Sequence, residues 1–470
     1  MFAAPRNGEL SGLGGIESRL TSGNLSSVEL TRHYLDRITR LDGALHSYVN
    51  VLRDQALSDA QRSDSERAQG RVRGPLHGIP FAIKDVYDAG GVATTAGSPA
   101  YIDCIAACDA TIVAKLRASG AVLLGKLATH ELTHGGVDFG LPWPPARNPW
   151  NLDFDPGGSS SGAGVAVAAD LCAFALGTDT GGSIRKPAGM CGIAGLKPTF
   201  GRVSRKGVVL NATSLDHCGP MAHSAADCAL VMQTIAGYDP LDPFCSSNGI
   251  SDYVAALELS IQGRRIGIVS HFWAEDLPVP SDIVRSIEQA IDVFKRLGAH
   301  TSDVRLKPIA EYTATKLTIQ QYELFATYGR EIQSRRNKFG PNIRYKMDDY
   351  ETITIDDYKA AKLHQRELTA DMLRAMGDVD VLVTAGPGPA APIAEVAARS
   401  GPPVADLTLP FNLTGFPSIA TCVGFTNAGL PYSIQVIGRP FEENLVLCFA
   451  NAYERETQWH LLRPKALETI

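Results

Sequence analysis

The sequence predicts an α/β fold in which helices cover a β-sheet. Residues 109–118 carry apolar side chains at helical spacing and are followed, after Gly120, by the strand-like run 121–124. Further along the chain, the apolar run 266–269 precedes a helical stripe over residues 283–297. Helices and strands that alternate with few residues between them are typical of α/β proteins, in which the helices pack on the sheet.

Local signals predict the other elements. Ser26 and Glu29 have the spacing of a capping box, which begins a helix whose apolar residues recur at helical positions. The short apolar run 81–83 predicts a buried strand with Lys84 at its end. Asp109 is the expected N-cap of the helix that follows it. Strands are also predicted at 379–383, 419–423 and 433–437.

Residues 306–364 are the least regular part of the sequence. They are polar, poor in glycine and helical in period, which predicts a helical insert beside the core. Four aromatic residues of this segment are candidates either for the wall of a substrate site or for the core of the insert: Tyr322, Phe325, Tyr328 and Tyr350. No low-complexity linker divides the chain, so we expect a single domain over residues 1–470.

Composition and charge argue against several classes of protein. The chain has 44 Lys and Arg against 50 Asp and Glu, a net charge of −6. A mildly acidic surface does not favour nucleic acid or an anionic membrane, and no apolar stretch is long enough to cross a bilayer. The nine cysteines are scattered and odd in number, which argues against a disulfide framework or a zinc site. Residues 1–8 lack the basic and apolar pattern of a secretory signal, so we expect a cytoplasmic protein.

The most informative stretch begins with Gly-Gly-Ser-Ser-Ser-Gly at 157–162 and continues with Ala, Gly and Val to residue 169. Its glycines permit a tight loop, and the small residues after them predict a helix packed closely against neighbouring backbone. A phosphate-binding loop is the alternative, because glycines before a helix can hold an anion. The stretch lacks both the Gly-Lys-Ser/Thr ending and the Gly-x-Gly-x-x-Gly order, so we do not favour a nucleotide site.

A second glycine turn, Thr180-Gly181-Gly182-Ser183, follows shortly afterwards. The backbone N–H groups of Thr180, Gly181 and Gly182 can converge on one point, as an oxyanion hole requires. A serine directly after these donors is placed to attack a carbonyl group whose oxygen they hold. The turn therefore predicts Ser183 as a nucleophile.

A serine hydroxyl needs an adjacent base, and the sequence has no evident Gly-x-Ser-x-Gly elbow with a histidine partner. A lysine can be that base if burial keeps its amine neutral. Lys84 follows a buried apolar run and meets this requirement. The alternative is that Lys84 lies at the surface and pairs with Asp85 or another carboxylate.

These motifs resemble the amidase signature family of serine hydrolases, and the similarity extends over nearly the whole chain. Beside the two glycine and serine segments, it rests on Gly-Ile-Pro-Phe-Ala-Ile-Lys-Asp at 78–85, Asn-Pro-Trp-Asn at 148–151, Gly-Ile-Ala-Gly-Leu-Lys-Pro-Thr at 192–199 and the segment 430–440. The resemblance implies a single large mixed β-sheet covered by helices on both faces, an α/β/α sandwich. The family includes fatty acid amide hydrolase and the A subunit of glutamyl-tRNA amidotransferase.

The resemblance also implies a Ser–Ser–Lys triad. Ser183 matches the nucleophile that carries the acyl group, and Lys84 matches the base. The bridging serine of the family lies 24 residues before the nucleophile, which selects Ser159 and places it after a cis peptide bond. Thr133 matches a position that lines the acyl pocket in relatives.

Further expectations concern the surroundings of the triad. The backbone N–H groups of Thr180, Gly181 and Gly182 are expected to form the oxyanion hole, and no metal or organic cofactor is implied. Asp179 and Arg185 flank the nucleophile turn and are expected to hold it through hydrogen bonds. Relatives often form dimers, so a homodimer is a further expectation.

The leading hypothesis is an amidase that hydrolyses a small or aryl carboxamide, with carbamate (urethane), aryl-acylamide or ester hydrolysis by the same acyl-enzyme route as an alternative. Another alternative is the glutamine-hydrolysing subunit of the tRNA-dependent amidotransferase. Those subunits place an acidic, glutamine-binding residue before a Thr-x-Pro-x-Asn segment, and here Asp406 stands one residue out of register before Thr408. A binding module that has lost catalysis is disfavoured, because Lys84, Ser159 and Ser183 are all present.

Overall fold

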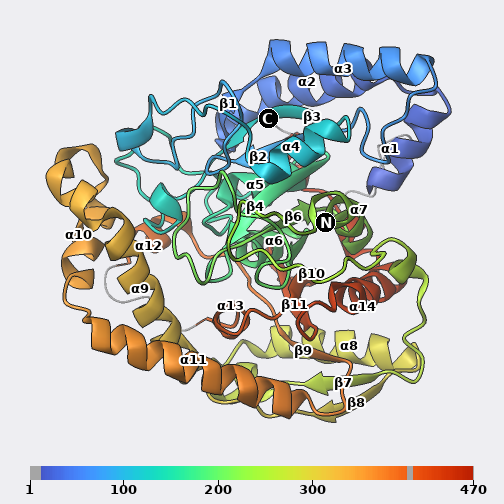
Figure 1. The fold of residues 1–470 in the computed structure, drawn as a ribbon. Helices are drawn as coiled ribbons and strands as arrows, with labels where there is room; N and C mark the ends of the chain where they lie inside the picture. Colours follow the sequence, from blue (N-terminus) through green and yellow to red (C-terminus); the bar gives the residue numbers. More distant parts are fainter. Residues whose placement is uncertain (1–11, 400–405, 469–470) are drawn as a thin grey trace.

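The computed structural model describes residues 12–399 and 406–468 and has one eleven-stranded sheet (Figure 1). The order of its strands is β1-β3-β2-β4-β6-β5-β10-β11-β9-β7-β8. The strands are β1 (Tyr48–Val51), β2 (Pro80–Lys84), β3 (Val122–Leu127), β4 (Phe174–Asp179), β5 (Ala194–Lys197), β6 (His217–Ala222), β7 (Arg265–Ile268), β8 (His300–Asp303), β9 (Val381–Ala385), β10 (Ser418–Phe425) and β11 (Pro431–Ile437). Residues 1–8, on which the expectation of a cytoplasmic location rests in part, lie outside the described residues.

The sheet is mixed, and helices pack against it (Figure 1). β2 is parallel to both of its neighbours, β3 and β4, whereas β10 is antiparallel to β5 and β11. The helices are α1 (Gly12–Thr21), α2 (Ser27–Leu45), α3 (Arg53–Ala68), α4 (Thr111–Ala118), α5 (Ser161–Ala168), α6 (Arg185–Cys191), α7 (Ala225–Ile235), α8 (Ser281–Arg296), α9 (Ile309–Ser334), α10 (Pro341–Tyr350), α11 (Ile355–Met376), α12 (Ile393–Ala398), α13 (Leu409–Leu413) and α14 (Glu443–Glu456). The predicted fold class is confirmed.

Two predicted helix starts have different outcomes. α2 begins at the predicted capping box, in which Ser26 N–H donates to the Glu29 carboxylate at 2.8 Å and Glu29 N–H donates to Ser26 Oγ. α4 has Ala110 as its N-cap, without a side-chain cap. Asp109 instead accepts the backbone N–H of Gly90 at 2.7 Å. The prediction that Asp109 caps this helix is wrong, because a tertiary contact uses its carboxylate.

The predicted strands are present as β2, β3, β7, β9, β10 and β11. β4 is not predicted, because its six residues form a short apolar run between two glycine loops. Periodicity cannot distinguish such a run from a buried link. β4 lies beside β2 in the sheet and leads directly into the turn that carries Ser183.

The segment predicted as a helical insert contains α9 and α10 and the first part of α11, which continues to Met376. Figure 1 shows α9 and α10 in yellow-orange along one side of the molecule and α11 in orange along its lower edge. α9 packs against α10, α11 and the short helix α13. The organisation of the chain as a single domain remains a prediction.

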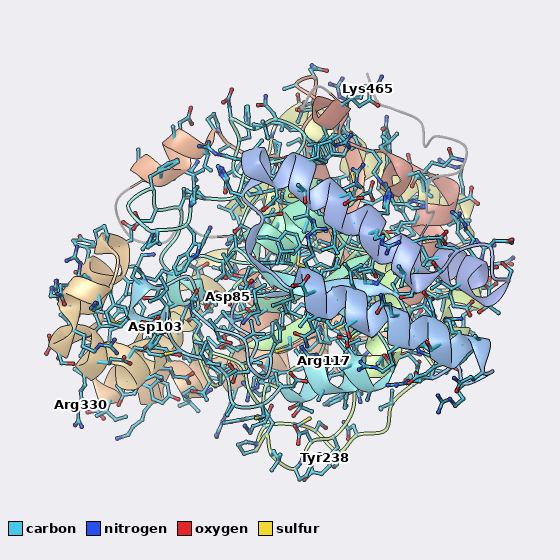
Figure 2. The ribbon with its side chains drawn as sticks, turned by 90° about the horizontal axis from the view of Figure 1, so that it is seen from above. Asp85, Asp103, Arg117, Tyr238, Arg330 and Lys465 are labelled. Atoms are coloured by element: carbon cyan, nitrogen blue, oxygen red, sulfur yellow. The ribbon has the colours of Figure 1, made fainter. Side chains whose placement is uncertain are left out.

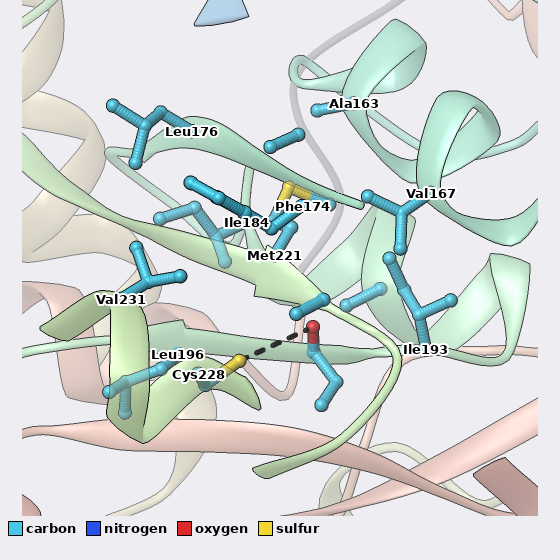
Figure 3. Close-up of a cluster of buried hydrophobic side chains, with 14 of the residues drawn as sticks. Ala163, Val167, Phe174, Leu176, Ile184, Ile193, Leu196, Met221, Cys228 and Val231 are labelled. Carbon is cyan, nitrogen blue, oxygen red and sulfur yellow. Dashed lines mark hydrogen bonds between the residues drawn. The ribbon is translucent and has the colours of Figure 1, made fainter. Parts of the chain in front are cut away.

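The helix after the first glycine loop, α5, is buried at every residue. In Figure 3, Ala163 and Val167 of this helix lie in the same apolar cluster as Phe174 of β4. Small residues are required here, because a Cβ on Gly162 would lie 2.4 Å from the carbonyl oxygen of Ser47. The close approach brings the loop that carries the central serines against the sheet.

α2 and α3 pack side by side over one face of the molecule (Figure 2). In the part of the chain that the structure describes, no helix combines the length and apolar character needed to cross a bilayer. All nine cysteines lie in that part and are free thiols; Cys104 and Cys108 are exposed and the others are buried.

Candidate active site

β2 and β4 are parallel neighbours and bring two side chains of the candidate site together. Lys84 is the last residue of β2, and Thr178 is the penultimate residue of β4. Lys84 Nζ lies 2.7 Å from Ser159 Oγ and 2.8 Å from Thr178 Oγ1. The residues predicted as base and bridging serine are therefore in hydrogen-bond contact. Thr178 is an additional partner that the sequence does not single out.

Lys84 is fully buried, and burial has the largest effect on its amine. Desolvation lowers the pKa of Lys84 to about 7, although Asp216 and Asp179 act in the opposite direction. The alternative of a surface pair with Asp85 is wrong. Asp85, labelled in Figure 2, is buried and pairs with Lys126 at 2.8 Å. The partners of the Lys84 amine are hydroxyl groups.

The loop before α5 carries Ser159 and is joined to the nucleophile turn. The Gly158–Ser159 peptide bond is cis, as the resemblance implies. The backbone N–H of Ser160 donates to the carbonyl oxygen of Ser183 at 3.2 Å. A Cβ on Gly158 would lie 2.1 Å from the His130 ring, so the loop has room only for glycine there. These contacts hold the loop of Ser159 beside the turn of Ser183.

Asp179 organises the nucleophile turn. Its carboxylate accepts the backbone N–H of Gly182 at 2.6 Å and that of Ile184 at 3.1 Å. It also pairs with the buried Arg185 guanidinium at 3.1 Å and accepts a hydrogen bond from Asn412 at 2.7 Å. Burial opposes ionisation, yet the Arg185 guanidinium holds the pKa of Asp179 well below its usual value. The expectation that Asp179 and Arg185 hold the turn by hydrogen bonds is confirmed.

The backbone groups expected to form an oxyanion hole differ in their contacts. The N–H of Gly182 is engaged by Asp179, so the geometry does not favour it as a donor to substrate. Within residues 12–399 and 406–468, the N–H groups of Thr180, Gly181 and Ser183 have no hydrogen-bond acceptor. These three groups, with Ser183 in place of Gly182, are the better candidates. The φ of Gly182 is 105°, a conformation that glycine permits and that lets the turn reverse.

A cavity of about 270 Å³ opens onto both serines. Lys84 does not line this cavity, but its amine contacts Ser159, which does. Thr133 is on the wall and buried, and its Oγ1 has no partner among the described residues, so this hydroxyl is available to a ligand. The predicted site residues on the wall are Ser159, Ser183, Thr180, Gly181 and Thr133.

A larger cavity, of about 650 Å³, lies elsewhere, between α1, α2 and residues 460–463. None of the predicted site residues is among the described residues that line this larger cavity. One of its acidic side chains, Asp170, already pairs with Arg463 at 3.1 Å and with His223 at 2.7 Å. We therefore place the candidate active site in the smaller cavity. No group of three or more His, Cys, Asp or Glu side chains suited to a metal ion is found in residues 12–399 and 406–468.

α9 and α10 supply another part of the wall of the smaller cavity. Lys316 and Gln320 of α9 and Lys346 of α10 line it. The four aromatic residues considered for this wall do not; Tyr322, for example, stacks on Tyr358 with ring centroids 4.5 Å apart. The sequence did not indicate these lysines, because lysines on a polar helix are ordinarily solvated.

The family model and three similar proteins that match this chain are described as amidases or as a subunit of an amidotransferase. The family model described as Amidase matches residues 29–447. The chain is 38% identical to the A subunit of glutamyl-tRNA(Gln) amidotransferase from Geobacter sp. (strain M21), over 95% of this chain and 97% of that protein. It is similar to the solved peptide amidase from Stenotrophomonas maltophilia, with 32% identity, a TM-score of 0.84 and coverage of 97% and 98% of the two chains. A bacterial aryl acylamidase of the amidase signature family has a TM-score of 0.86 at 25% identity, covering 96% of this chain and 98% of that chain.

Proposed function

Because the chain belongs to the amidase family, whose enzymes act on C–N amide bonds, we propose that it hydrolyses a small or aryl carboxamide through an acyl-enzyme on Ser183. The observation that carries this proposal is the 2.7 Å contact between Lys84 Nζ and Ser159 Oγ. A buried amine with a pKa of about 7 is partly neutral at physiological pH and can accept a proton. Ser159 and Ser183 line one cavity, which supports a relay from one hydroxyl to the other.

The proposed reaction has two halves. In the first, Lys84 takes a proton from Ser159, Ser159 takes the proton of Ser183, and Ser183 Oγ bonds to the amide carbon. The backbone N–H groups of the turn hold the oxyanion. The proton returns along the same path to the leaving nitrogen, the C–N bond breaks, and an ester on Ser183 remains. In the second half, water attacks this ester with the same relay and releases the acid.

Hydrolysis of a carbamate, an aryl-acylamide or an ester is the first alternative, because only the acyl or leaving group would differ. Glutamine hydrolysis within an amidotransferase complex is the second, and the 38% identity to the Geobacter protein favours it. Against it, Asp406 pairs with Lys186 at 2.8 Å and accepts the Thr408 hydroxyl at 2.6 Å. This carboxylate is thus occupied within the protein, so we rank glutamine below other small amides.

A substrate panel tests the proposal. Aliphatic amides, aryl amides, carbamates and glutamine are compared by kcat/KM in wild type and in Ser183→Ala. Ser334→Ala is the control, because Ser334 is exposed and, among the described residues, its Oγ donates only to the carbonyl of Glu331 at 3.0 Å. We expect turnover of at least one amide, a loss of about 10³-fold or more in Ser183→Ala, and no change in Ser334→Ala.

Acid-quenched mass spectrometry adds a direct readout, since the acyl group should be found on the peptide that contains Ser183. Turnover by Ser183→Ala at the wild-type rate would overturn the assignment. The homodimer and the cytoplasmic location remain predictions. A molar mass by light scattering of twice that of the chain supports the homodimer, and a mass equal to that of the chain contradicts it.

A further inference from the structure

Two lysines outside the proposed triad line the same cavity as Ser159 and Ser183. Lys316 of α9 is buried, with 4% of its surface exposed, and Lys346 of α10 is half-buried. Removing an ammonium group from water costs free energy unless an opposite charge or hydrogen-bond acceptors compensate it. The contacts of these two lysines therefore indicate what the cavity is suited to bind.

The described residues supply only some of the hydrogen-bond acceptors, and none of the paired negative charge, that the ammonium groups of Lys316 and Lys346 require. Lys346 Nζ donates to the carbonyl oxygen of His134 at 2.8 Å, and Lys316 Nζ donates to Gln320 Oε1. Neither lysine forms an ion pair with a carboxylate in the described ranges 12–399 and 406–468. A lysine ammonium has three N–H donors. Each of these two consequently has donors to spare for a ligand.

The cavity has an excess of positive charge. A third lysine, Lys186, is compensated by Asp406 at 2.8 Å, and the described wall has one acidic side chain, Asp155. Burial, and then the charge of Lys186, lowers the pKa of Lys316 to about 7. Burial lowers the pKa of Lys346 to about 8. The protein by itself thus disfavours both charged amines, and an anionic ligand would restore them.

The groups that hold the two lysines carry no negative charge. Gln320 Nε2 donates to Asn211 Oδ1 at 2.7 Å and contacts His134 Nδ1 at 3.2 Å. With Nδ1 as the acceptor, the other ring nitrogen of His134 donates to the Tyr350 hydroxyl at 2.5 Å. Burial holds the pKa of His134 well below its usual value, so the ring is neutral. This network turns Gln320 Oε1 toward Lys316 and fixes the position of its amine.

Lys316 also lies against the nucleophile turn. A Cβ on Gly181 would be 2.7 Å from Lys316 Nζ. A group bound by Lys316 would therefore share the cavity with the amide that Ser183 attacks. The volume of 270 Å³ is below the range of about 300–1,000 Å³ that is typical of drug-sized ligands. The cavity is therefore suited to one small molecule that carries both groups.

We propose that the substrate is an amide that carries a carboxylate, and that Lys316 and Lys346 bind this carboxylate. A carboxylate supplies the opposite charge and the acceptors that the two ammonium groups lack, and hydrogen bonds between such charged groups are strong. Suitable classes are the monoamides of short dicarboxylic acids and the N-acyl aminobenzoates. The inference rests on the proposed amidase function and specifies its substrate.

The test compares amides of nearly the same shape with and without the carboxylate. Succinamate is paired with 4-oxopentanamide, and 4-acetamidobenzoate with 4-acetamidoacetophenone. We expect the wild-type enzyme to prefer the carboxylate member of at least one pair by about ten-fold or more in kcat/KM. Lys316→Met and Lys346→Met should each reduce this preference, mainly through KM. Lys316→Gln, which is neutral but keeps a hydrogen-bonding side chain, should reduce it as well.

Lys359→Met is the matched control. Lys359 lies on α11, is exposed and pairs with Asp356 at 3.3 Å, so its replacement removes the same charge away from the cavity. The preference should be unchanged in this variant. The proposal is overturned if the wild-type enzyme hydrolyses both members of each pair equally well. It is also overturned if the preference survives the Lys316 and Lys346 substitutions.

Binding to Ser183→Ala separates this inference from the proposed function. Calorimetric titration of that variant with succinamate and with 4-acetamidobenzoate measures recognition without turnover. Binding that disappears when Lys316→Met is added supports the carboxylate site, even if no amide in the panel is hydrolysed. Turnover of neutral amides together with no binding of either carboxylate overturns the site and leaves the amidase function intact.

Discussion

Lys84 Nζ lies 2.7 Å from Ser159 Oγ, and none of the described carboxylates forms an ion pair with it. The neighbouring strand β3 provides a contrast, because Lys126 is equally buried yet pairs with Asp85 at 2.8 Å. An ion pair favours the charged form and so opposes the effect of burial, which lowers the pKa of Lys126, whereas hydroxyl partners in a desolvated site permit a neutral amine. Two buried lysines on adjacent strands thus have different electrostatic surroundings, and only those of Lys84 suit a general base.

Lys84→Met should lose most of the activity while gaining stability. Loss of a general base costs about 10²–10⁴-fold in rate. The pKa of Lys84 is lowered from 10.5 to about 7, so the folded protein disfavours a proton that the unfolded chain retains. This cost is fully present below pH 7 and is lost as the pH rises toward 10.5. Urea unfolding at about pH 7 and about pH 10 should show an advantage of the variant only at the lower pH.

Lys126→Met is the matched control for this experiment. It leaves Asp85 buried without its cation, and breaking a buried ion pair by removing one partner costs about 3–5 kcal/mol. The two variants should therefore change the free energy of unfolding in opposite directions. If both are destabilised alike, Lys84 is held charged in the folded protein and cannot act as the neutral base proposed here.

The pH dependence of kcat/KM reports the same amine. For a neutral amide the rate should rise with pH through a midpoint near 7, because only unprotonated Lys84 can accept a proton. Initial rates between about pH 5 and pH 9 measure this midpoint. A neutral substrate is required, since the pKa of Lys316 is also lowered to about 7 and would affect binding of an anion. A midpoint near 4 would indicate a carboxylate as the base instead.

Thr178→Val tests whether the second hydroxyl partner positions the amine. The substitution keeps the shape of the side chain and removes the oxygen that lies 2.8 Å from Lys84 Nζ. The charged amine loses more from this than the neutral amine does, so the pKa of Lys84 should fall and the midpoint should move to lower pH. We expect kcat to fall about ten-fold, as for one lost hydrogen bond. Thr178→Ser should restore both kcat and the pH midpoint. If Thr178→Val lowers kcat but leaves the midpoint unchanged, Thr178 acts through packing alone and does not position the amine.

Asp179→Asn should be strongly destabilising. The substitution leaves the Arg185 guanidinium buried without its counter-charge, which costs about 3–5 kcal/mol of unfolding free energy. Asp348→Asn is the control, because Asp348 pairs with Arg336 at 2.6 Å on the surface and such pairs contribute less than about 1 kcal/mol. Guanidinium chloride unfolding measures both. A cost for Asp179→Asn as small as that for Asp348→Asn would contradict the role of Asp179 in the turn.

Local patterns predicted those elements whose signals lie within a few residues. The capping box of Ser26 and Glu29 marks the start of α2, and the small residues after Gly157 predict the buried helix α5. Predictions were wrong or missing for features that depend on a contact with a residue outside the local segment. The carboxylate of Asp109 is engaged by the backbone of Gly90 rather than by its own helix, and β4 is recognisable as a strand only beside β2. Spacing along one segment carries no information about such partners.

The sequence by itself determined which residue types are available for chemistry, namely Lys84 after an apolar run and Ser159 and Ser183 in two glycine loops. Only the tertiary structure decided that Asp85 pairs with a different lysine, and that Lys316, on a polar helix far along the chain, lies against the nucleophile turn. The physical reason is that positions within a segment depend on local backbone geometry. Contacts between distant segments depend instead on how the helices and strands pack together.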